Sequence, residues 1–210
     1  MITIYGGWPT RSFRVVWLLE EMGVPYRTRP VDLRRRATDA EFLALNPAGF
    51  LPVLEDGQVR MVESVAMLEY LTGRYGPTPL APVPTDNRYP DFLQFLHLGE
   101  AGLAAYLNIA VASRFMAPEA ERENFGRLTA ERMFLNRLRL VSDRLERSPH
   151  LAGDDFTAAD ISVAYALDLG DRLGLAEKYP AVVSAYRDRL AARDAHARAI
   201  ARDPPSTAPA

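Results

Sequence analysis

The sequence predicts two domains of different class, an N-terminal α/β domain of βαβ–ββα order followed by an all-α C-terminal domain. In residues 1–76, short β-rich runs alternate with segments whose apolar residues recur at helical spacing. Residues 77–86 are rich in proline and form the predicted linker, because proline cannot continue a helix and favours an extended path. Only helical spacing follows over residues 87–203, and residues 204–210 are expected to be a disordered tail.

The first β–α–β unit is predicted from the order of β-rich runs and helical spacing. Residues 2–5 are β-rich and predict a strand, and residues 12–22 carry apolar side chains at helical spacing. Ser12 is a candidate cap for the start of this helix, and Gly23 stands where a C-terminal cap is expected. Residues 25–31 then predict a second strand.

The rest of this domain predicts a short helix, a hairpin and a longer helix. Residues 39–45 have helical spacing and end before an Asn-Pro pair. Two short apolar runs, 51–54 and 59–62, are separated by Asp56-Gly57, a pair typical of tight hairpin turns. A helix is expected from residue 64 to residue 75, which completes the order strand, strand, helix.

The C-terminal domain contains only helix signals. Spaced leucines predict a long helix from about residue 86 to a break near Pro118, and a second helix over residues 128–145. Thr157 and Asp160 form a predicted capping box at the next helix start, so we expect Asp160 to have a structural role. A further helix is expected to begin near Pro180, since proline is favoured in the first turn.

The composition is that of a globular protein without extreme charge. Of the 210 residues, 48% are hydrophobic and 25% charged, with a formal net charge of −2, which argues against disorder and against general attraction to nucleic acid. The chain has no cysteine, which excludes disulfides and thiolate metal sites, and its three histidines are scattered, so no metal site is expected. We expect no signal peptide and no membrane-spanning stretch, and therefore a cytoplasmic location.

Four stretches in this order resemble the cytosolic glutathione transferases, over nearly the whole chain. They are residues 12–23, 46–54, 63–64 and 156–160. The resemblance implies a thioredoxin-like N-terminal domain, a helical C-terminal domain and a homodimer. Because the chain lacks cysteine, it is most similar to bacterial-type members with a serine or threonine active site, and the cysteine-type members are not suitable models.

The resemblance implies how glutathione, the expected co-substrate, would be held. Pro52 corresponds to a cis proline of the family, which turns the backbone of Leu51 outward to pair with the cysteinyl backbone of glutathione. Glu63 and Ser64 precede a helix, whose N-terminus favours a carboxylate such as that of the γ-glutamyl group. The Ser64 hydroxyl would donate to this carboxylate, and the Glu63 carboxylate would meet the ligand's ammonium group.

A hydroxyl in the turn before the first helix is expected to donate to the glutathione sulfur. The helix dipole and unpaired N–H groups there would also favour thiolate over thiol and so raise the concentration of the nucleophile. By resemblance Thr10 is the first candidate, Ser12 the second and Tyr5 the third.

The sequence departs from the family at Phe50. Many relatives have Lys, Arg or Gln there to hold the glycyl carboxylate, which Phe50 cannot do, so Arg11 or Arg35 is the expected substitute. A hydrophobic acceptor pocket is expected between the two domains. The aromatic and apolar residues predicted to line it are Trp8, Phe13, Tyr106, Phe115 and Met116.

The resulting functional prediction is a detoxifying glutathione transferase, which activates the bound thiol for attack on an electrophilic small molecule. A glutathione-dependent peroxide or disulfide reductase is the alternative within the enzyme class, since it needs the same thiolate. A non-catalytic binding module with the same fold is the alternative outside it. No nucleic-acid or membrane partner is expected, and the acceptor substrate cannot be read from the sequence.

Overall fold

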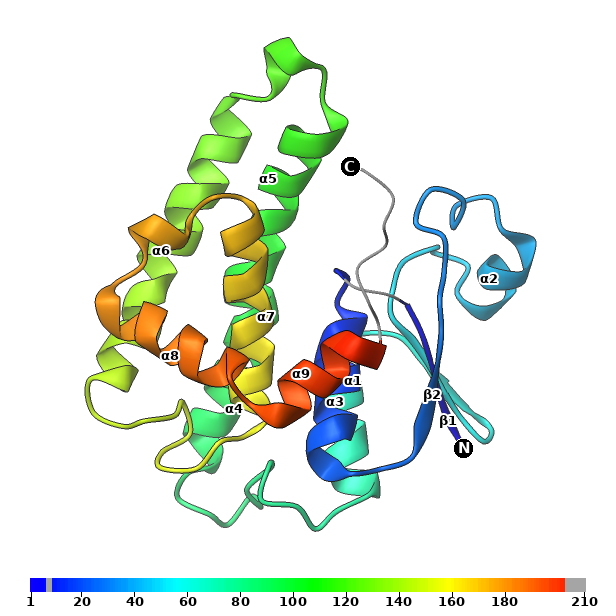
Figure 1. Cartoon of the computed structure of the whole chain (residues 1–210), viewed down its shortest axis with the longest axis vertical. Helices are drawn as coiled ribbons and strands as arrows, with labels where there is room; N and C mark the ends of the chain where they lie inside the picture. The colour runs from blue at the N-terminus through cyan, green and yellow to red at the C-terminus, as the bar shows by residue number, and fades with distance from the viewer. Residues whose placement is uncertain (7–8, 203–210) are drawn as a thin grey trace. The chain divides into compact units, whose positions relative to one another are not determined.

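The computed structural model describes residues 1–6 and 9–202. Two compact units divide the chain. The first contains Met1–Thr78 together with the described residues from Ala192 onward, and the second contains Pro79–Ala191 (Figure 1). Each unit has its own buried core.

The division between the units differs in one respect from the predicted domains. The boundary after Thr78 falls within residues 77–86, which the sequence analysis assigned to the linker. The last helix was assigned to the helical domain of residues 87–203, whereas its contacts place it with the first unit. The predicted tail, residues 204–210, lies outside the described residues.

The first unit is a mixed sheet with helices on both faces. Its elements in chain order are β1 (Ile2–Tyr5), α1 (Ser12–Met22), β2 (Tyr26–Arg29), α2 (Ala40–Leu45), β3 (Val53–Asp56), β4 (Val59–Met61), α3 (Ser64–Arg74) and α9 (Asp194–Arg202). The strand order is β2-β1-β3-β4, with β1 parallel to β2 and antiparallel to β3, and β3 antiparallel to β4. The predicted α/β class and element order are confirmed.

Helix α1 occupies the centre of this unit. Every residue from Ser12 to Leu19 is buried, which is the pattern of a helix covered on all sides. It contacts β1, α3 and α9. The helix ends where the sequence predicted, because Gly23 adopts a left-handed φ of 64° and its N–H donates to the carbonyl of Leu19.

Helix α9 packs on α1 through small residues and opposite charges. Ala195 and Ala199 are buried, which lets the two helices approach closely. Arg193 forms a two-point pair with Glu21, in which Nε donates to Oε1 at 2.7 Å and Nη2 to Oε2 at 2.8 Å. Arg198 Nε donates to Glu20 Oε2 at 2.9 Å. Helix α9 was not predicted from the sequence as a separate helix.

Between these ion pairs, His196 of α9 packs edge-on against two aromatic rings of α1. Its ring centroid lies 4.7 Å from that of Trp17 and 5.2 Å from that of Phe13, with interplanar angles of 86° and 84°. Only 8% of the residue is exposed. Burial lowers the pKa of His196, and the nearby charge of Glu21 opposes this shift only in part.

The second unit is helical, as predicted. Its elements are α4 (Tyr89–His97), a π-helical segment (Leu98–Ala104), α5 (Ala105–Met116), a 3₁₀ turn (Glu119–Glu121), α6 (Phe125–Leu145), α7 (Ala158–Arg172), a second 3₁₀ turn (Ala176–Lys178) and α8 (Ala181–Ala191). Helix α7 is the core of this unit, because every residue from Ala158 to Leu167 is buried. Gly99 of the π-helical segment allows close packing, since a Cβ there would lie 2.3 Å from Ser162 Oγ.

The run Tyr89–Met116 is helical, long and apolar enough to cross a membrane by length and composition. No such stretch was expected from the sequence, because its apolar residues are interrupted by a few charges. Core helices pass the same test, and 39% of the most apolar window, which has a mean hydropathy of 1.3, is buried. Its α4 and π-helical parts pack against α7.

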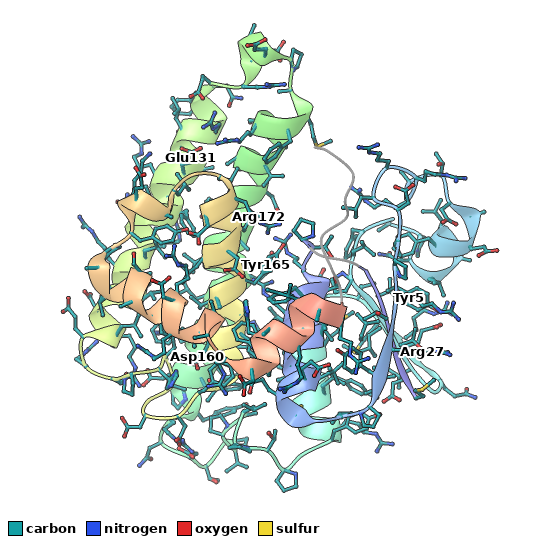
Figure 2. All side chains as sticks on the ribbon, viewed as in Figure 1. Tyr5, Arg27, Glu131, Asp160, Tyr165 and Arg172 are labelled. Atoms are coloured by element: carbon teal, nitrogen blue, oxygen red, sulfur yellow. The ribbon has the colours of Figure 1, made fainter. Side chains whose placement is uncertain are left out.

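Asp160 lies at the start of α7 (Figure 2). It is fully buried and accepts four hydrogen bonds. Its Oδ2 accepts from the backbone N–H of Thr157 at 2.8 Å and from the Thr157 hydroxyl at 3.1 Å. Its Oδ1 accepts from the N–H of Leu151 at 3.0 Å and from the hydroxyl of Tyr186 at 2.7 Å. The predicted structural role extends beyond the capping box, because this carboxylate also fixes the preceding loop and α8.

Asp160→Ala is expected to lower the stability of the protein strongly, because it leaves several buried donors without an acceptor. Each such group costs roughly 1–3 kcal/mol, so a loss of about 3 kcal/mol or more is expected. Thermal and urea unfolding followed by circular dichroism measure it. Asp143→Ala, which removes an exposed carboxylate from α6, is the matched control. Equal melting temperatures for Asp160→Ala and wild type would contradict the structural role.

The packing of His196 predicts a loss of stability in mild acid. The pKa of His196 is lowered in the folded protein, so the unfolded chain binds a proton more readily than the folded one. The contribution of His196 to the free energy of unfolding is therefore fully present above the ordinary pKa of about 6.5 and falls as the pH drops through this value. His196→Phe should keep the ring packing and reduce this loss. Urea midpoints between pH 7.5 and pH 5 measure it, with the exposed His97→Gln as control. A pH dependence identical to wild type in His196→Phe would contradict the assignment.

Candidate functional site

The turn before α1 brings the two predicted hydroxyl candidates into contact. Thr10 Oγ1 and Ser12 Oγ lie 2.7 Å apart, and either can be the donor. Thr10 is partly exposed, whereas Ser12 is fully buried. Ser12 is not the helix cap that the sequence predicted, because the helix begins with Ser12 itself and Arg11 holds the capping position without a side-chain bond.

The backbone N–H groups of this turn are largely used within the turn. The N–H of Phe13 donates to the carbonyl of Thr10 at 3.1 Å, and the N–H of Arg14 donates to that of Arg11 at 3.2 Å. The N–H of Ser12 approaches Thr10 Oγ1 at 3.4 Å. The expectation of unpaired N–H groups therefore fails for these residues, and the helix dipole and the hydroxyls remain as the means of stabilising an anion.

Gly6 allows β1 to end directly against this turn. A Cβ at Gly6 would lie 2.5 Å from Ser12 Cβ and 2.6 Å from Ser12 Oγ, closer than real side-chain atoms approach. Its φ of 150° is also one that residues with a side chain rarely adopt. The hydroxyl pair thus depends on a glycine at this position.

Tyr5, the third hydroxyl candidate, lies at the end of β1 (Figure 2), and its phenol is already hydrogen-bonded. Its phenol donates to Glu55 Oε2 at 2.7 Å, and this hydrogen bond raises the pKa of Tyr5. The residue packs against the small cluster around Phe42 of α2. A phenol held in this way has less tendency to ionise, which makes it a poorer candidate than the threonine.

The Leu51–Pro52 peptide is cis, as the resemblance implied. Leu51 is 8% exposed and belongs to the cluster with Phe42 and Val53. The preceding loop is held by Asn46, whose side chain is buried. Its Nδ2 donates to the carbonyl of Phe50 at 2.7 Å, and its Oδ1 accepts from the N–H of Ala48 at 3.1 Å. This role of Asn46 was not predicted from the sequence.

Glu63 has an unusual backbone at the start of α3. Its φ of 74° makes it the one non-glycine residue with positive φ in the part of the chain that the structure describes. Such a conformation costs roughly 1–3 kcal/mol and is typical of ligand-binding positions. Its side chain makes no capping bond to the helix, and the residue is exposed. The following residue, Ser64, is 2% exposed.

Arg14 is a site residue that the sequence analysis missed. It is fully buried in α1, and its Nη1 donates to Ser64 Oγ at 3.1 Å. Because a guanidinium can only donate, Ser64 Oγ must accept, and its own hydrogen remains available to another acceptor. A charged residue inside the otherwise apolar residues 13–19 was the signal that could have identified it.

The remaining predicted residues are placed as follows. Arg11 is partly exposed beside Thr10, Arg35 is exposed, and Phe50 is 39% exposed. Phe13 is wrongly predicted as a pocket residue, because it is fully buried against His196 and offers no surface to a ligand.

The other predicted pocket residues lie on α5, except Trp8, which is outside the described residues. Tyr106 is partly exposed, and the guanidinium of Arg137 lies over its ring, with Cζ 4.4 Å from the ring centroid. Phe115 is 54% exposed and Met116 79% exposed. Within residues 1–6 and 9–202, no group of three or more histidine, aspartate or glutamate side chains is arranged to hold a metal ion.

Comparisons with known proteins match both halves of the chain to one family. Residues 1–73 match the model of the glutathione S-transferase N-terminal domain, and residues 104–194 match that of the C-terminal domain. Glutathione S-transferase 3 of Schizosaccharomyces pombe is 27% identical over 189 residues, which are 85% of this chain and 78% of that protein.

Two further similarities extend over almost the full length. Glutathione S-transferase F10 of Arabidopsis thaliana is 30% identical over 207 residues, which are 93% of this chain and 94% of that protein. The crystal structure of glutathione transferase URE2P6 of Phanerochaete chrysosporium, in complex with oxidized glutathione, superposes with a TM-score of 0.84 at 24% identity and covers 96% of both chains.

Proposed function

The chain belongs to the glutathione S-transferase family, and on this premise we propose that it binds glutathione, activates its thiol and transfers it to an electrophilic small molecule. The observation that carries the proposal is the pair of hydroxyls at the N-terminus of α1, with Ser64 and the strained Glu63 at the start of α3. The first group offers a site for a sulfur anion, and the second a site for a carboxylate.

We propose a serine/threonine-type mechanism in which Thr10 donates to the sulfur. Thr10 is the partly exposed member of the pair and Ser12 the buried one, so a bound ligand can reach Thr10. If Ser12 donates its hydrogen to Thr10 Oγ1, the hydrogen of Thr10 is free to point to the sulfur. A donor to sulfur, with the positive end of the α1 dipole, favours the thiolate and lowers the pKa of the thiol.

The peptide part of glutathione is proposed to bind along β3 and the start of α3. The backbone of Leu51, before the cis Pro52, would pair with the cysteinyl backbone. Ser64 would donate to the γ-glutamyl carboxylate, since Arg14 occupies its lone pair, and Glu63 would meet the ammonium group. Because Phe50 cannot hold the glycyl carboxylate, Arg11 is the proposed partner for that end.

The acceptor is proposed to be a hydrophobic electrophile, with Tyr106 and Phe115 of α5 as contact candidates. The described chain supplies aromatic surface for such a ligand, because both side chains are at least partly exposed. We further propose that the protein is a cytoplasmic homodimer, as the resemblance to the family implies.

The proposed activation predicts a lowered thiol pKa for glutathione bound to the wild-type protein, measured from the thiolate absorbance during a pH titration. Thr10→Ala should raise this pKa towards that of free glutathione and reduce kcat about tenfold or more, with little change in glutathione affinity. Ser12→Ala should have a smaller effect, and Thr85→Ala, an exposed threonine, none. A bound thiol with its solution pKa would exclude activation, and a larger loss for Ser12→Ala would reverse the two roles.

The contact between Arg14 and Ser64 predicts that Arg14 acts on one carboxylate of the ligand. Arg14→Met should weaken glutathione binding about tenfold, the effect of losing one charge-assisted hydrogen bond. Binding of 4-aminobutanoyl-cysteinyl-glycine, which lacks the γ-glutamyl α-carboxylate, should be weak and unchanged by the substitution. Calorimetric titration of both ligands measures this.

Two further variants distinguish the loss of a ligand contact from a folding defect. Arg14→Lys keeps the charge and should keep part of the affinity, and Ser64→Ala should reproduce the selective loss without removing a buried charge. Melting curves report whether each variant folds. Equal weakening of both ligands by Arg14→Met and Ser64→Ala would show that these residues do not contact the carboxylate, even indirectly.

A further inference from the structure

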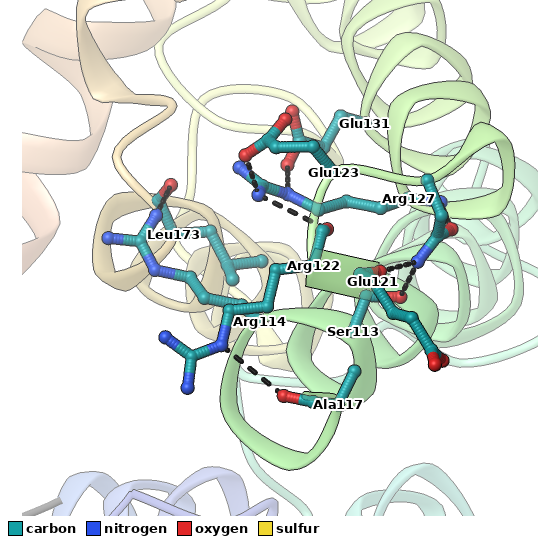
Figure 3. A network of polar contacts seen from close by, with 10 residues as sticks. Ser113, Arg114, Ala117, Glu121, Arg122, Glu123, Arg127, Glu131 and Leu173 are labelled. Carbon is teal, nitrogen blue, oxygen red and sulfur yellow. Dashed lines mark hydrogen bonds and ion pairs between the residues drawn. The ribbon is translucent and has the colours of Figure 1, made fainter. Parts of the chain in front are cut away.

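A cavity of about 560 Å³ lies at the junction between the end of α5 and the beginning of α6, within the second unit. Its volume is in the range of sites for small organic molecules. The residues that line it are Arg114, Phe115, Arg122, Glu123 and Arg127. Three guanidinium groups and one aromatic ring therefore line one open space, with a single carboxylate among them. Figure 3 shows the three arginines and Glu123.

Arg127 is neutralised by carboxylates of its own helix and of the preceding turn. Its Nε donates to Glu131 Oε1 at 2.7 Å, and its Nη1 pairs with Glu123 (Figure 3). Only 10% of the Glu131 side chain and 13% of the Arg127 side chain are exposed, so this pair is a fixed part of the wall. Arg127 thus contributes little free charge to the cavity.

Arg114 and Arg122 are bonded only to neutral carbonyl groups. Arg114 Nη1 donates to the carbonyl of Leu173 at 2.9 Å, and Arg122 Nε donates to that of Ala117 at 3.3 Å (Figure 3). Neither forms an ion pair with a carboxylate within residues 1–6 and 9–202. Each keeps unused N–H donors, which for Arg122 are both terminal nitrogens. The cavity wall therefore holds two guanidinium groups that form no ion pair in the described chain, each positioned by a carbonyl group.

Phe115 adds an apolar surface beside these charges. The residue is 54% exposed, although a phenylalanine is normally buried. The Cζ atom of Arg114 lies 5.8 Å from the centroid of its ring. A ligand with a flat apolar body could stack on this ring and place an anionic group between the two arginines.

We infer that this cavity binds a small aromatic carboxylate, whose carboxylate pairs with Arg114 and Arg122 and whose ring packs on Phe115. Guanidinium groups match the planar carboxylate and can each donate two parallel hydrogen bonds. The ring selects against small inorganic anions, which cannot use the apolar wall. The inference does not rest on the proposed glutathione site, because none of the residues that line the cavity is proposed to hold glutathione; Phe115 alone is shared with the proposed acceptor contacts.

The test is calorimetric titration of the full chain, without glutathione, with naphthalene-1-carboxylate. Its neutral counterpart, naphthalene-1-carboxamide, has the same ring and nearly the same shape. The carboxylate should bind at least about tenfold more tightly than the amide, and Arg114→Gln and Arg122→Gln should each weaken the carboxylate about tenfold. Neither substitution should change binding of the amide.

Two matched variants complete the design. Arg139→Gln removes an exposed charge from α6 away from the cavity and should leave carboxylate affinity unchanged. Glu123→Gln removes the one opposing charge in the wall and should tighten carboxylate binding a few-fold. All four variants should behave like the wild type on immobilised glutathione, which separates this test from that of the proposed function.

Three outcomes would overturn the inference. They are equal affinities for carboxylate and amide, an equal loss in Arg139→Gln and Arg114→Gln, and weaker carboxylate binding in Glu123→Gln. The second outcome would show a general charge effect in place of a site. The third would show that the charge of Glu123 does not oppose the ligand and that the anion binds elsewhere. Substitution of the exposed side chains should not prevent folding, which melting curves verify.

Discussion

The first unit depends on the complete burial of α1. A helix whose residues 12–19 are all buried can be placed only if every neighbour is complementary to it. Its N-terminal turn presents Thr10 and Ser12, its middle places Arg14 against Ser64, and its last turns hold α9 through Glu20 and Glu21. A shift of this helix would move both proposed anion sites together, so the packing of α1 fixes their geometry.

Two features next to this helix are unfavourable for stability and therefore point to binding. Arg14 is a fully buried cation, whose desolvation costs several kcal/mol before its contacts offset it. Glu63 holds a backbone conformation that a side chain disfavours by roughly 1–3 kcal/mol. Both lie at Ser64, one through a hydrogen bond and the other as its neighbour in the chain. Neither is needed to form α3, which a simple serine cap could begin, so a requirement of the ligand is the better explanation.

The sequence predicted the features that depend on local pattern and missed those that depend on distant partners. The β1, α1 and β3–β4 elements follow from alternation, helical spacing and turn residues such as Gly23 and Asp56-Gly57, and they lie within two residues of their predicted places. Phe13 was misplaced because a buried aromatic and a pocket aromatic have the same spacing on a helix. Arg14 and Asn46 were missed because their partners are Ser64 and the backbone of the loop that they hold.

Helix α9 shows the same limit. Its buried face consists of Ala195, His196 and Ala199, too few and too small to produce an apolar pattern in the sequence. What holds it is complementarity to α1, whose acidic end meets the arginines of a helix more than 170 residues away in the chain. Small residues let the backbones approach, and the charges then select the register. Since α1 carries the hydroxyl pair at its other end, α9 supports the proposed sulfur site through its packing on α1. The two proposed anion sites thus differ in rigidity, because Ser64 and Arg14 are buried, whereas Thr10 is partly exposed.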